Sequence, residues 1–170
     1  MEAKDYIRIE LDGLERSMKR VVTGLTKPEC AWRPASGCNS IGLILFHTAR
    51  SEDSFVQSRM QGKPEVWVTG KWYEKLHLPE TEVGSHYTIQ QVNTFPTPDL
   101  EETLAYYATV RAKTLEYLKE LAPDAFERTL TMPQGRTASV AAIFALIVSH
   151  AAQHVGEISY LRGVQRGAES

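Results

Sequence analysis

The sequence predicts an all-α fold, a four-helix bundle with a long connection between helices 2 and 3. In four segments of the chain, apolar residues recur at steps of three or four and so share one face of an α-helix. The segments begin near Lys4, Ser40, Thr97 and Ser139. Each is about 20 residues long, and helices with one apolar face bury it against one another. The irregular stretch 62–96 separates the second segment from the third and is long enough for a crossover connection.

The first helix is expected over Lys4–Leu25, with charged residues on the side opposite its apolar stripe. The stripe steps alternately by four and three residues, which suits packing against near-parallel helices. Its members are Ile7, Leu11, Leu14, Met18, Val21 and Leu25. A loop follows, and we expect Trp32 in this loop to cover one end of the core.

The second helix is expected over Ser40–Gln61, with Asn39 or Ser40 as its N-cap. His47 follows Ile44 by three residues and therefore belongs near the apolar face.

Residues 62–96 are the least regular part, with aromatic residues scattered among glycines and prolines. A loop of this length inside a compact domain is usually functional, and we interpret it as a lid or rim over one end of the molecule. Lys71–Leu78 is compatible with one short helix. His77 and His86 have no partner at ligand spacing and are expected to be solvated loop residues.

The third helix is expected to begin with Thr97 as its N-cap and Pro98 in its first turn, and to stop before Pro123. Residues 126–136 then alternate loosely between apolar and polar and favour a short hairpin.

The fourth helix is expected to begin at a cap formed by Thr137 or Ser139 and to run to Arg162, with Gly163 marking its end.

The composition indicates a soluble cytoplasmic protein of one domain, residues 1–170. The formal net charge is −2 and no basic stripe is visible, so we expect no nucleic-acid partner. The chain is charged from Glu2 onward, unlike a signal peptide, and the apolar run Val140–Val148 is too short to cross a membrane. Cys30 and Cys38 are expected to be free thiols in a reducing compartment.

The fourth helix carries two histidines within its apolar stripe. The stripe comprises Val140, Ile143, Ile147, His150, His154, Ile158 and Leu161. Residues four apart lie on the same side of a helix, so His150 and His154 can bind one metal ion. Two core histidines, each with its own hydrogen-bond partner, would produce the same pattern, and this helix alone leaves both interpretations open.

His47 brings the histidines on inward faces to three. Three neutral imidazoles with an open fourth position suit a catalytic rather than a structural zinc site. Nickel and iron accept the same ligands. A di-iron carboxylate bundle is excluded, because it needs Glu-x-x-His pairs and none of these histidines follows a glutamate by three residues.

Two longer segments contain the three histidines, Trp32–Asp53 and Ser149–Ile158. Together with the turn Met132–Thr137 and the loop from Trp72 to Gly84, they form an ordered set of short motifs. In this set, and over nearly its whole length, the chain resembles the DinB-like metal-binding four-helix bundles, also called the DinB/YfiT-like superfamily.

The resemblance implies a metal site at His47, His150 and His154, commonly zinc or nickel, and frequent homodimers. It also implies, for some members, transfer or isomerisation with the low-molecular-weight thiols mycothiol or bacillithiol, whereas many have no known activity. Glu157 departs from the family, which often has Gln there. A carboxylate one turn from His154 can orient that ligand, bind the metal or face solvent, and we favour the orienting role.

We therefore expect a metal-binding DinB-like protein and consider two functions. One is a metal-dependent enzyme that activates a small-molecule thiol or water, as a thiol S-transferase or a hydrolase. Trp72 would then cover the substrate, and Arg50 would bind a substrate carboxylate unless it is a surface arginine paired with an acid. No side chain stands out as a catalytic base. The alternative is a non-catalytic, stress-associated binding or dimerisation module with a structural metal.

Overall fold

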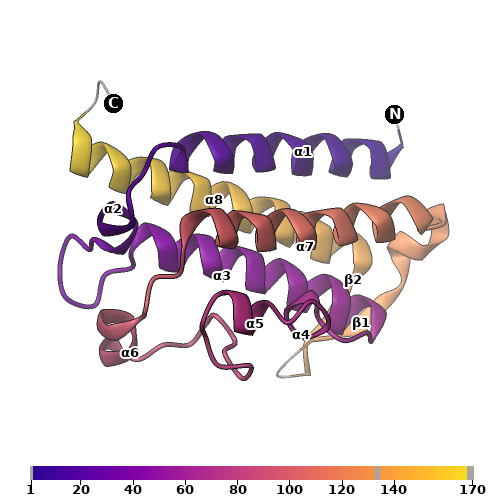
Figure 1. Ribbon diagram of the computed structural model, residues 1–170. Helices are drawn as coiled ribbons and strands as arrows, with labels where there is room; N and C mark the ends of the chain where they lie inside the picture. Colours follow the sequence, from indigo (N-terminus) through magenta and orange to yellow (C-terminus); the bar gives the residue numbers. More distant parts are fainter. Residues whose placement is uncertain (1, 133–134, 168–170) are drawn as a thin grey trace.

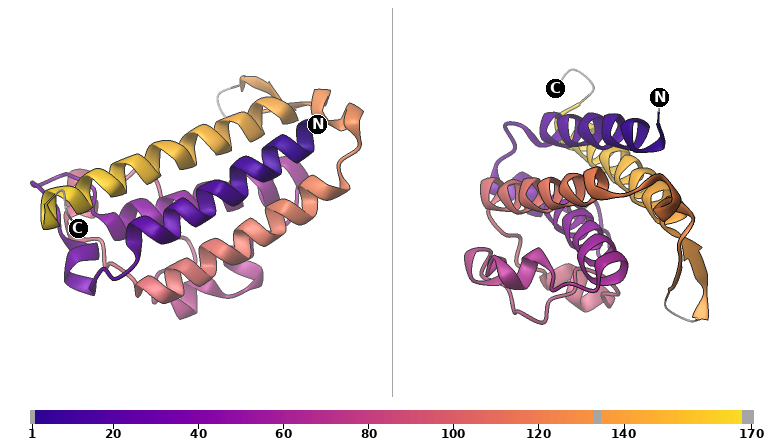
Figure 2. Two further views of the ribbon diagram at one scale, coloured as in Figure 1. Left: turned by 90° about the horizontal axis from the view of Figure 1, so that it is seen from above. Right: turned by 90° about the vertical axis from the view of Figure 1, so that its right-hand side faces the viewer.

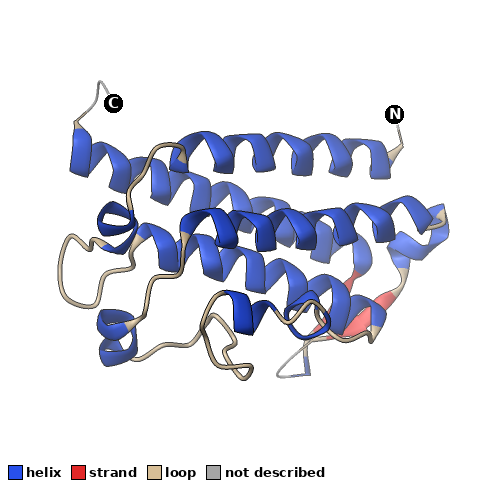
Figure 3. Ribbon diagram, viewed as in Figure 1, coloured by secondary structure: helices blue, strands red, loops and turns tan. Residues whose placement is uncertain are grey.

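The computed structural model describes residues 2–132 and 135–167 and confirms the all-α four-helix bundle (Figures 1 and 3). The long helices are α1 (Ala3–Val22), α3 (Ile41–Asp53), α7 (Leu100–Glu120) and α8 (Val140–Arg166). α1 packs against α8 and α7, and α3 packs against the same two helices, so the four close a ring (Figure 2). α1 and α8 run in one direction and α3 and α7 in the other. The connection between the parallel helices α3 and α7 therefore returns along the bundle, as its predicted length allows.

The shorter elements lie at the ends of the bundle and along one side of it (Figure 1). They are α2 (Lys27–Ala31), α4 (Val66–Thr69), α5 (Trp72–Lys75), α6 (Ile89–Thr94) and the 3-10 helix η2 (Pro123–Glu127). α3 continues directly into a π-helical segment, η1 (Ser54–Met60). The predicted hairpin is present as the antiparallel pair β1 (Thr129–Thr131) and β2 (Thr137–Ser139). The tip of its predicted turn, residues 133–134, lies outside the described residues.

Side-chain caps start the helices that border the predicted site. The hydroxyl of Ser40 accepts from the N–H of Leu43 at the start of α3, and that of Ser139 accepts from the N–H of Ala142 at the start of α8. Each serine was one of the two residues predicted as the cap of its helix, because a short polar side chain satisfies the free N–H groups of a first turn.

The cap predicted for the third helix is wrong. Asp99 caps α7, because its Oδ1 accepts from the N–H groups of Glu101 and Glu102 at 2.9 and 3.1 Å. Its carboxylate also interacts favourably with the positive end of the helix dipole. Thr97, the predicted cap, is instead buried before the helix begins.

α8 also extends one turn beyond its predicted end at Gly163. The guanidinium of Arg166 pairs with the carboxylate of Glu29 at 2.6 Å, and that of Arg162 donates to the carbonyl of Thr23 at 2.8 Å. These contacts hold the last turn of α8 against α2 and the α1–α2 connection, so the helix continues past Gly163.

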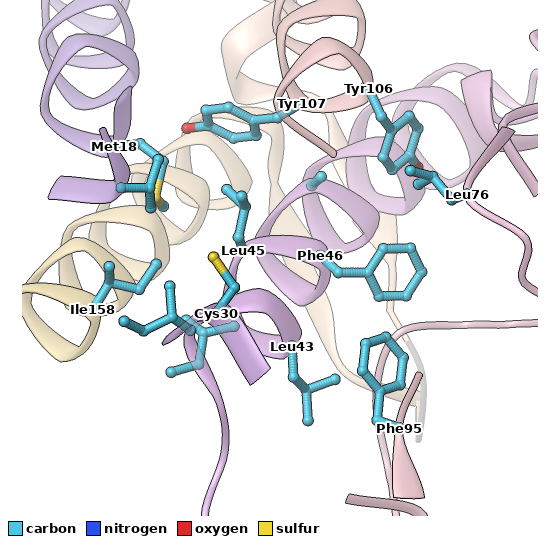
Figure 4. Close-up of a cluster of buried hydrophobic side chains, with 14 of the residues drawn as sticks. Met18, Cys30, Leu43, Leu45, Phe46, Leu76, Phe95, Tyr106, Tyr107 and Ile158 are labelled. Carbon is cyan, nitrogen blue, oxygen red and sulfur yellow. The ribbon is translucent and has the colours of Figure 1, made fainter. Parts of the chain in front are cut away.

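The stretch 62–96 packs along one side of the bundle and is not a lid over one end, so this prediction was wrong, although part of the stretch lines the cavity described below. Several of its side chains enter the core. The indole of Trp67 is fully buried and packs against Phe46 and Tyr106, each at 5.5 Å between ring centroids. Trp32, the indole expected to cover the core, is 37% exposed. Figure 4 shows Phe95 from the same stretch beside Phe46 of α3. These aromatic contacts join the connection to the helices along the side of the bundle.

A buried ion pair joins α3 to α7. Nη2 of Arg111 lies 2.7 Å from Oε2 of Glu52, and the two side chains are 1% and 2% exposed. The same guanidinium donates to the carbonyl of Leu11 on α1 and to the hydroxyl of Tyr107. One arginine thus contacts three of the four long helices.

Among the described residues, α8 is the one helix that is long and apolar enough to cross a membrane by length and composition. Core helices of globular proteins pass the same test, so the observation is weak evidence for a membrane span. Here α8 packs lengthwise against α1 and α3 as a member of the bundle.

Glu52→Gln should lower the free energy of unfolding by about 3–5 kcal/mol, because it leaves the guanidinium of Arg111 buried without its counter-charge. The control is Glu116→Gln, which breaks an ion pair with Lys113 whose side chains are 56% and 53% exposed. Urea denaturation followed by circular dichroism measures both variants. Equal changes in the two would contradict a structural role for the buried pair.

Candidate metal centre

Three imidazoles converge between α3 and α8. Nε2 of His150 lies 3.0 Å from Nε2 of His47 and 3.0 Å from Nε2 of His154. The three possible ligand atoms all lie within 4.8 Å of one another. Ligand nitrogens around a tetrahedral zinc ion, with bonds of about 2.0–2.1 Å, are about 3.3 Å apart. Two of the three separations are near this value and the third is at most 4.8 Å, so the three predicted histidines could hold one such ion.

In two of the rings, the hydrogen bond made by Nδ1 determines whether Nε2, the nitrogen that faces the other histidines, carries a proton. Nδ1 of His47 lies 2.7 Å from the carbonyl oxygen of Gly84, and Nδ1 of His154 lies 2.6 Å from Oε2 of Glu157. A carbonyl or carboxylate oxygen accepts, so each Nδ1 carries the proton and donates. In the neutral rings, Nε2 of His47 and Nε2 of His154 then present lone pairs toward His150.

A bound cation would satisfy the three facing Nε2 atoms better than hydrogen bonds among the histidines themselves. A single Nε2–H on His150 cannot align with both facing lone pairs, whereas a cation at the centre attracts all three nitrogens. Glu157 thus contacts the ring of His154 and not the centre itself. Its position supports the orienting role that the sequence suggested, which is common for carboxylates behind metal-binding histidines.

Burial keeps the imidazoles of His47 and His150 in the neutral form that binds metals. Burial lowers the pKa of His47, and this effect exceeds the opposing effect of its hydrogen bond to Gly84. Burial, and then the neighbouring His154 and His47, lower the pKa of His150 to about 4. Both rings are therefore neutral at neutral pH, and a metal ion need not displace a proton from them.

Gly84 can hold His47 only because it lacks a side chain. Its φ is +75°, in the left-handed region, and a Cβ there would lie 2.8 Å from Cβ of Arg50. The close approach places the carbonyl of Gly84 at the ring of His47. The sequence contained no signal for this contact, because the two residues lie in different elements and no spacing relates them.

Arg50 pairs with acids, as one of the two interpretations expected, but it is buried and not a surface residue. The side chain is 5% exposed, and its guanidinium contacts Asp53, Glu65 and the hydroxyl of Tyr106. Its Nε donates to the carbonyl of Glu82 at 3.2 Å. All these partners are internal, so Arg50 positions the 82–84 backbone and does not reach a substrate.

Trp72 also lies away from the histidines. It is 8% exposed, packs against Tyr106 at 5.5 Å and carries the ammonium group of Lys75 over its ring at 4.0 Å. The described residues place it in the core beside α7 and not in the lining of the cavity at the metal centre.

A cavity of about 280 Å³ lies against His47 and His154. Its apolar lining comes from Leu43 and Ile44 of α3 and from Val92 of α6. α6 thus forms part of the site, although no helix was predicted there from the sequence.

His86 lines the same cavity. Both loop histidines are exposed, as expected, but His77 lies at a different pocket. The position of His86 at this cavity was not predicted from the sequence. Only the path of the backbone around Gly84 brings this side chain there.

The fold and the three converging histidines define a helical bundle with a candidate metal centre on two facing helices. The DinB superfamily profile matches residues 10–158, and the chain belongs to this superfamily. A search of curated protein sequences found no significant match.

Two solved structures have similar folds. A conserved protein from Enterococcus faecalis is 22% identical, with a TM-score of 0.85 over 96% of this chain and 97% of that one. YfiT from Bacillus subtilis is 18% identical, with a TM-score of 0.66 over 96% of this chain and 87% of that one. It is described as "a probable metal-dependent hydrolase with an unusual four-helix bundle topology".

Gly84→Ala should lower both stability and metal affinity, because the new Cβ meets Arg50 and moves the carbonyl that orients His47. The affinity loss should be about tenfold or more, as for other changes behind metal-binding histidines. The matched control is Gly24→Ala, which has the same φ of +75° and nothing within 4 Å of the added Cβ. Competition with a chromogenic chelator measures zinc affinity, and equal affinities in the two variants would contradict the orienting role.

Proposed function

We propose that this chain is a metal-dependent enzyme in which His47, His150 and His154 hold a divalent ion, zinc or nickel. The proposed reaction activates a low-molecular-weight thiol or water, as in a thiol S-transferase or a hydrolase. The observation that supports it is an open three-histidine centre beside a cavity. Among the described residues, no carboxylate or thiol completes the cluster of ligand atoms.

Each neighbouring residue has a defined part in this proposal. A bound divalent ion would supply Lewis acidity and lower the pKa of a thiol or water at the open position. Gly84 and Glu157 orient the rings of His47 and His154 through their Nδ1 atoms. Leu43, Ile44 and Val92 give the cavity apolar walls, which limit the access of water to the reacting group.

YfiT is described as a probable metal-dependent hydrolase, and this likeness favours a metal-dependent reaction for this chain. The description names no substrate.

We also propose a cytoplasmic location, which the two free thiols favour. The Cys30 thiol is buried and its pKa is raised to about 11, mainly by that burial, so we propose no reactive role for it. The non-catalytic alternative would be favoured by a fourth protein ligand at the centre. Glu157 does not provide one, because its carboxylate contacts Nδ1 of His154.

Elemental analysis of protein purified without a histidine tag tests the metal site. Wild type should contain about one equivalent of zinc or nickel, and His47→Ala should lose it, because two imidazoles hold such ions far less tightly. His77→Ala, a histidine in another pocket, should keep the metal. Added metal should raise the melting temperature of wild type and His77→Ala only. Metal-free wild type that metal does not stabilise would contradict the proposal.

We further propose that the protein forms a homodimer through α8 and the adjoining side of α1. Residues 140–156 contain no Asp, Glu, Lys or Arg, although part of this segment faces outward. Its exposed positions are Ala142, Ala145, Leu146, Ser149, Ala152, Gln153 and Gly156. On α1, Tyr6 and Ile9 are 53% and 48% exposed.

An uncharged face of small residues supports a second copy as the partner. The same face on two copies can meet across a two-fold axis without like charges in contact. The small side chains also allow two helices to approach closely. An exposed apolar face of this kind is typical of protein–protein contact sites.

Ala145→Glu should convert the dimer to a monomer, because it places two carboxylates at the proposed contact. The matched control is Ala105→Glu, at an exposed position of α7 on another side of the bundle. Light scattering after size-exclusion chromatography measures the molar mass. A wild-type monomer, or dissociation by both variants alike, would contradict this interface.

A further inference from the structure

We propose that His86 is a substrate-contacting residue, whose imidazole hydrogen-bonds an uncharged polar group of a small substrate in the cavity beside the histidine centre. This inference rests on the proposed function, since the substrate's other end would occupy the open position of the centre. The segment that carries His86 is a short arch, residues 82–87, between α5 and α6.

The two ends of this arch are tied to one carboxylate. Oε1 of Glu82 accepts from the N–H of Gly84 at 2.9 Å and from the hydroxyl of Tyr87 at 2.8 Å. The ring of Tyr87 also packs against Phe95 at 5.8 Å. Side-chain contacts therefore fix the residues on either side of Ser85 and His86.

The arch is also tied to the metal centre and to the core. The carbonyl of Glu82 accepts from Nε of the buried Arg50, and the carbonyl of Gly84 accepts from Nδ1 of His47. The backbone next to His86 is thus positioned by one of the proposed ligands itself. A side chain on this arch has a defined place relative to the centre.

The backbone of His86 is strained. Its φ is +61°, a conformation that residues other than glycine adopt at a cost of about 1–3 kcal/mol. Such strain persists where surrounding contacts determine the backbone, and it is enriched at functional sites. Among the hydrogen bonds of residues 2–132 and 135–167, none engages the imidazole of His86, and the side chain is exposed at the cavity. It is therefore available to a ligand.

The cavity defines the class of substrate that the imidazole would meet. Its volume of about 280 Å³ is at the lower limit of small-molecule pockets, so it suits a small compound or one end of a larger one. None of its described lining residues is Asp, Glu, Lys or Arg. Arg50, the residue that the sequence suggested for binding a carboxylate, is engaged by its own partners. The part of the substrate that enters should therefore be uncharged, with a short apolar chain and a hydroxyl or amide.

Paired thiols on the cobalt-loaded protein test this inference. The pairs are 2-mercaptoethanol with ethanethiol, and 3-mercapto-1-propanol with 1-propanethiol. Members of a pair differ in one terminal hydroxyl, and the two lengths allow for the distance between the centre and His86. The visible absorption of cobalt reports binding, and the quantity compared is the ratio of the two dissociation constants within a pair.

The variant is His86→Gly, and the matched control is His77→Gly. Both histidines are exposed and have positive φ, +61° and +54°, so glycine relieves the same backbone strain in each. Both variants should bind about one equivalent of cobalt. Their melting temperatures should equal or exceed that of wild type.

In His86→Gly, the preference for the hydroxyl-bearing thiol should fall by about threefold to tenfold in at least one pair, the effect of one lost hydrogen bond. It should be unchanged in His77→Gly. Thiol binding with an unchanged preference in His86→Gly would overturn the role of His86 and leave the proposed function intact. No cobalt binding, or no spectral response to any thiol, would overturn the thiol-activating function and this inference with it.

Discussion

The buried carboxylate of Asp53 is the interaction on which the rest of the structure depends. It accepts from the backbone N–H groups of Val66 and Trp67 and from the hydroxyl of Tyr106, at 2.9, 2.8 and 2.7 Å. These bonds join the end of α3 to the start of α4 and to α7. Burial raises the pKa of Asp53, against the opposing effect of these bonds and of Arg50. A buried acceptor with this many donors fixes the start of the long connection against the bundle, and without them its desolvation would be unfavourable.

The same network reaches the histidine centre through Arg50. This guanidinium contacts Asp53 on its own helix and the carbonyl of Glu82 on the returning connection. Two residues later, Gly84 accepts from His47. A sequence of direct contacts thus runs from the core to the ring orientation of a proposed metal ligand. The connection between α3 and α7 therefore orients a proposed ligand that α3 itself carries, and it also brings His86 to the cavity.

The two helices of the centre contribute in different ways. α8 places His150 and His154 one turn apart, and Glu157, one turn farther on, orients the second of them. α3 contributes one histidine, whose orientation comes from the connection. The only acid in contact with the three rings is at the exposed outer nitrogen of His154, as far as the described residues show. A divalent ion at this centre would keep most of its positive charge, which favours Lewis-acid chemistry over a purely structural role.

The sequence by itself determined the four long helices and the inward position of His47, His150 and His154, and it reduced the caps of α3 and α8 to two candidates each. These features depend on the helical repeat and on contacts within one turn, and both are local in the chain. Only the tertiary structure decided that Trp67 lies in the core, that Arg50 is an anchor, and that Gly84 and His86 belong to the site. Each of these depends on contacts between residues that are far apart in sequence, and helical periodicity contains no information about such contacts. Glu157 lies between the two cases: its spacing from His154 is local, but the sequence left three roles open for it, and the structure shows its contact with Nδ1 of that ring.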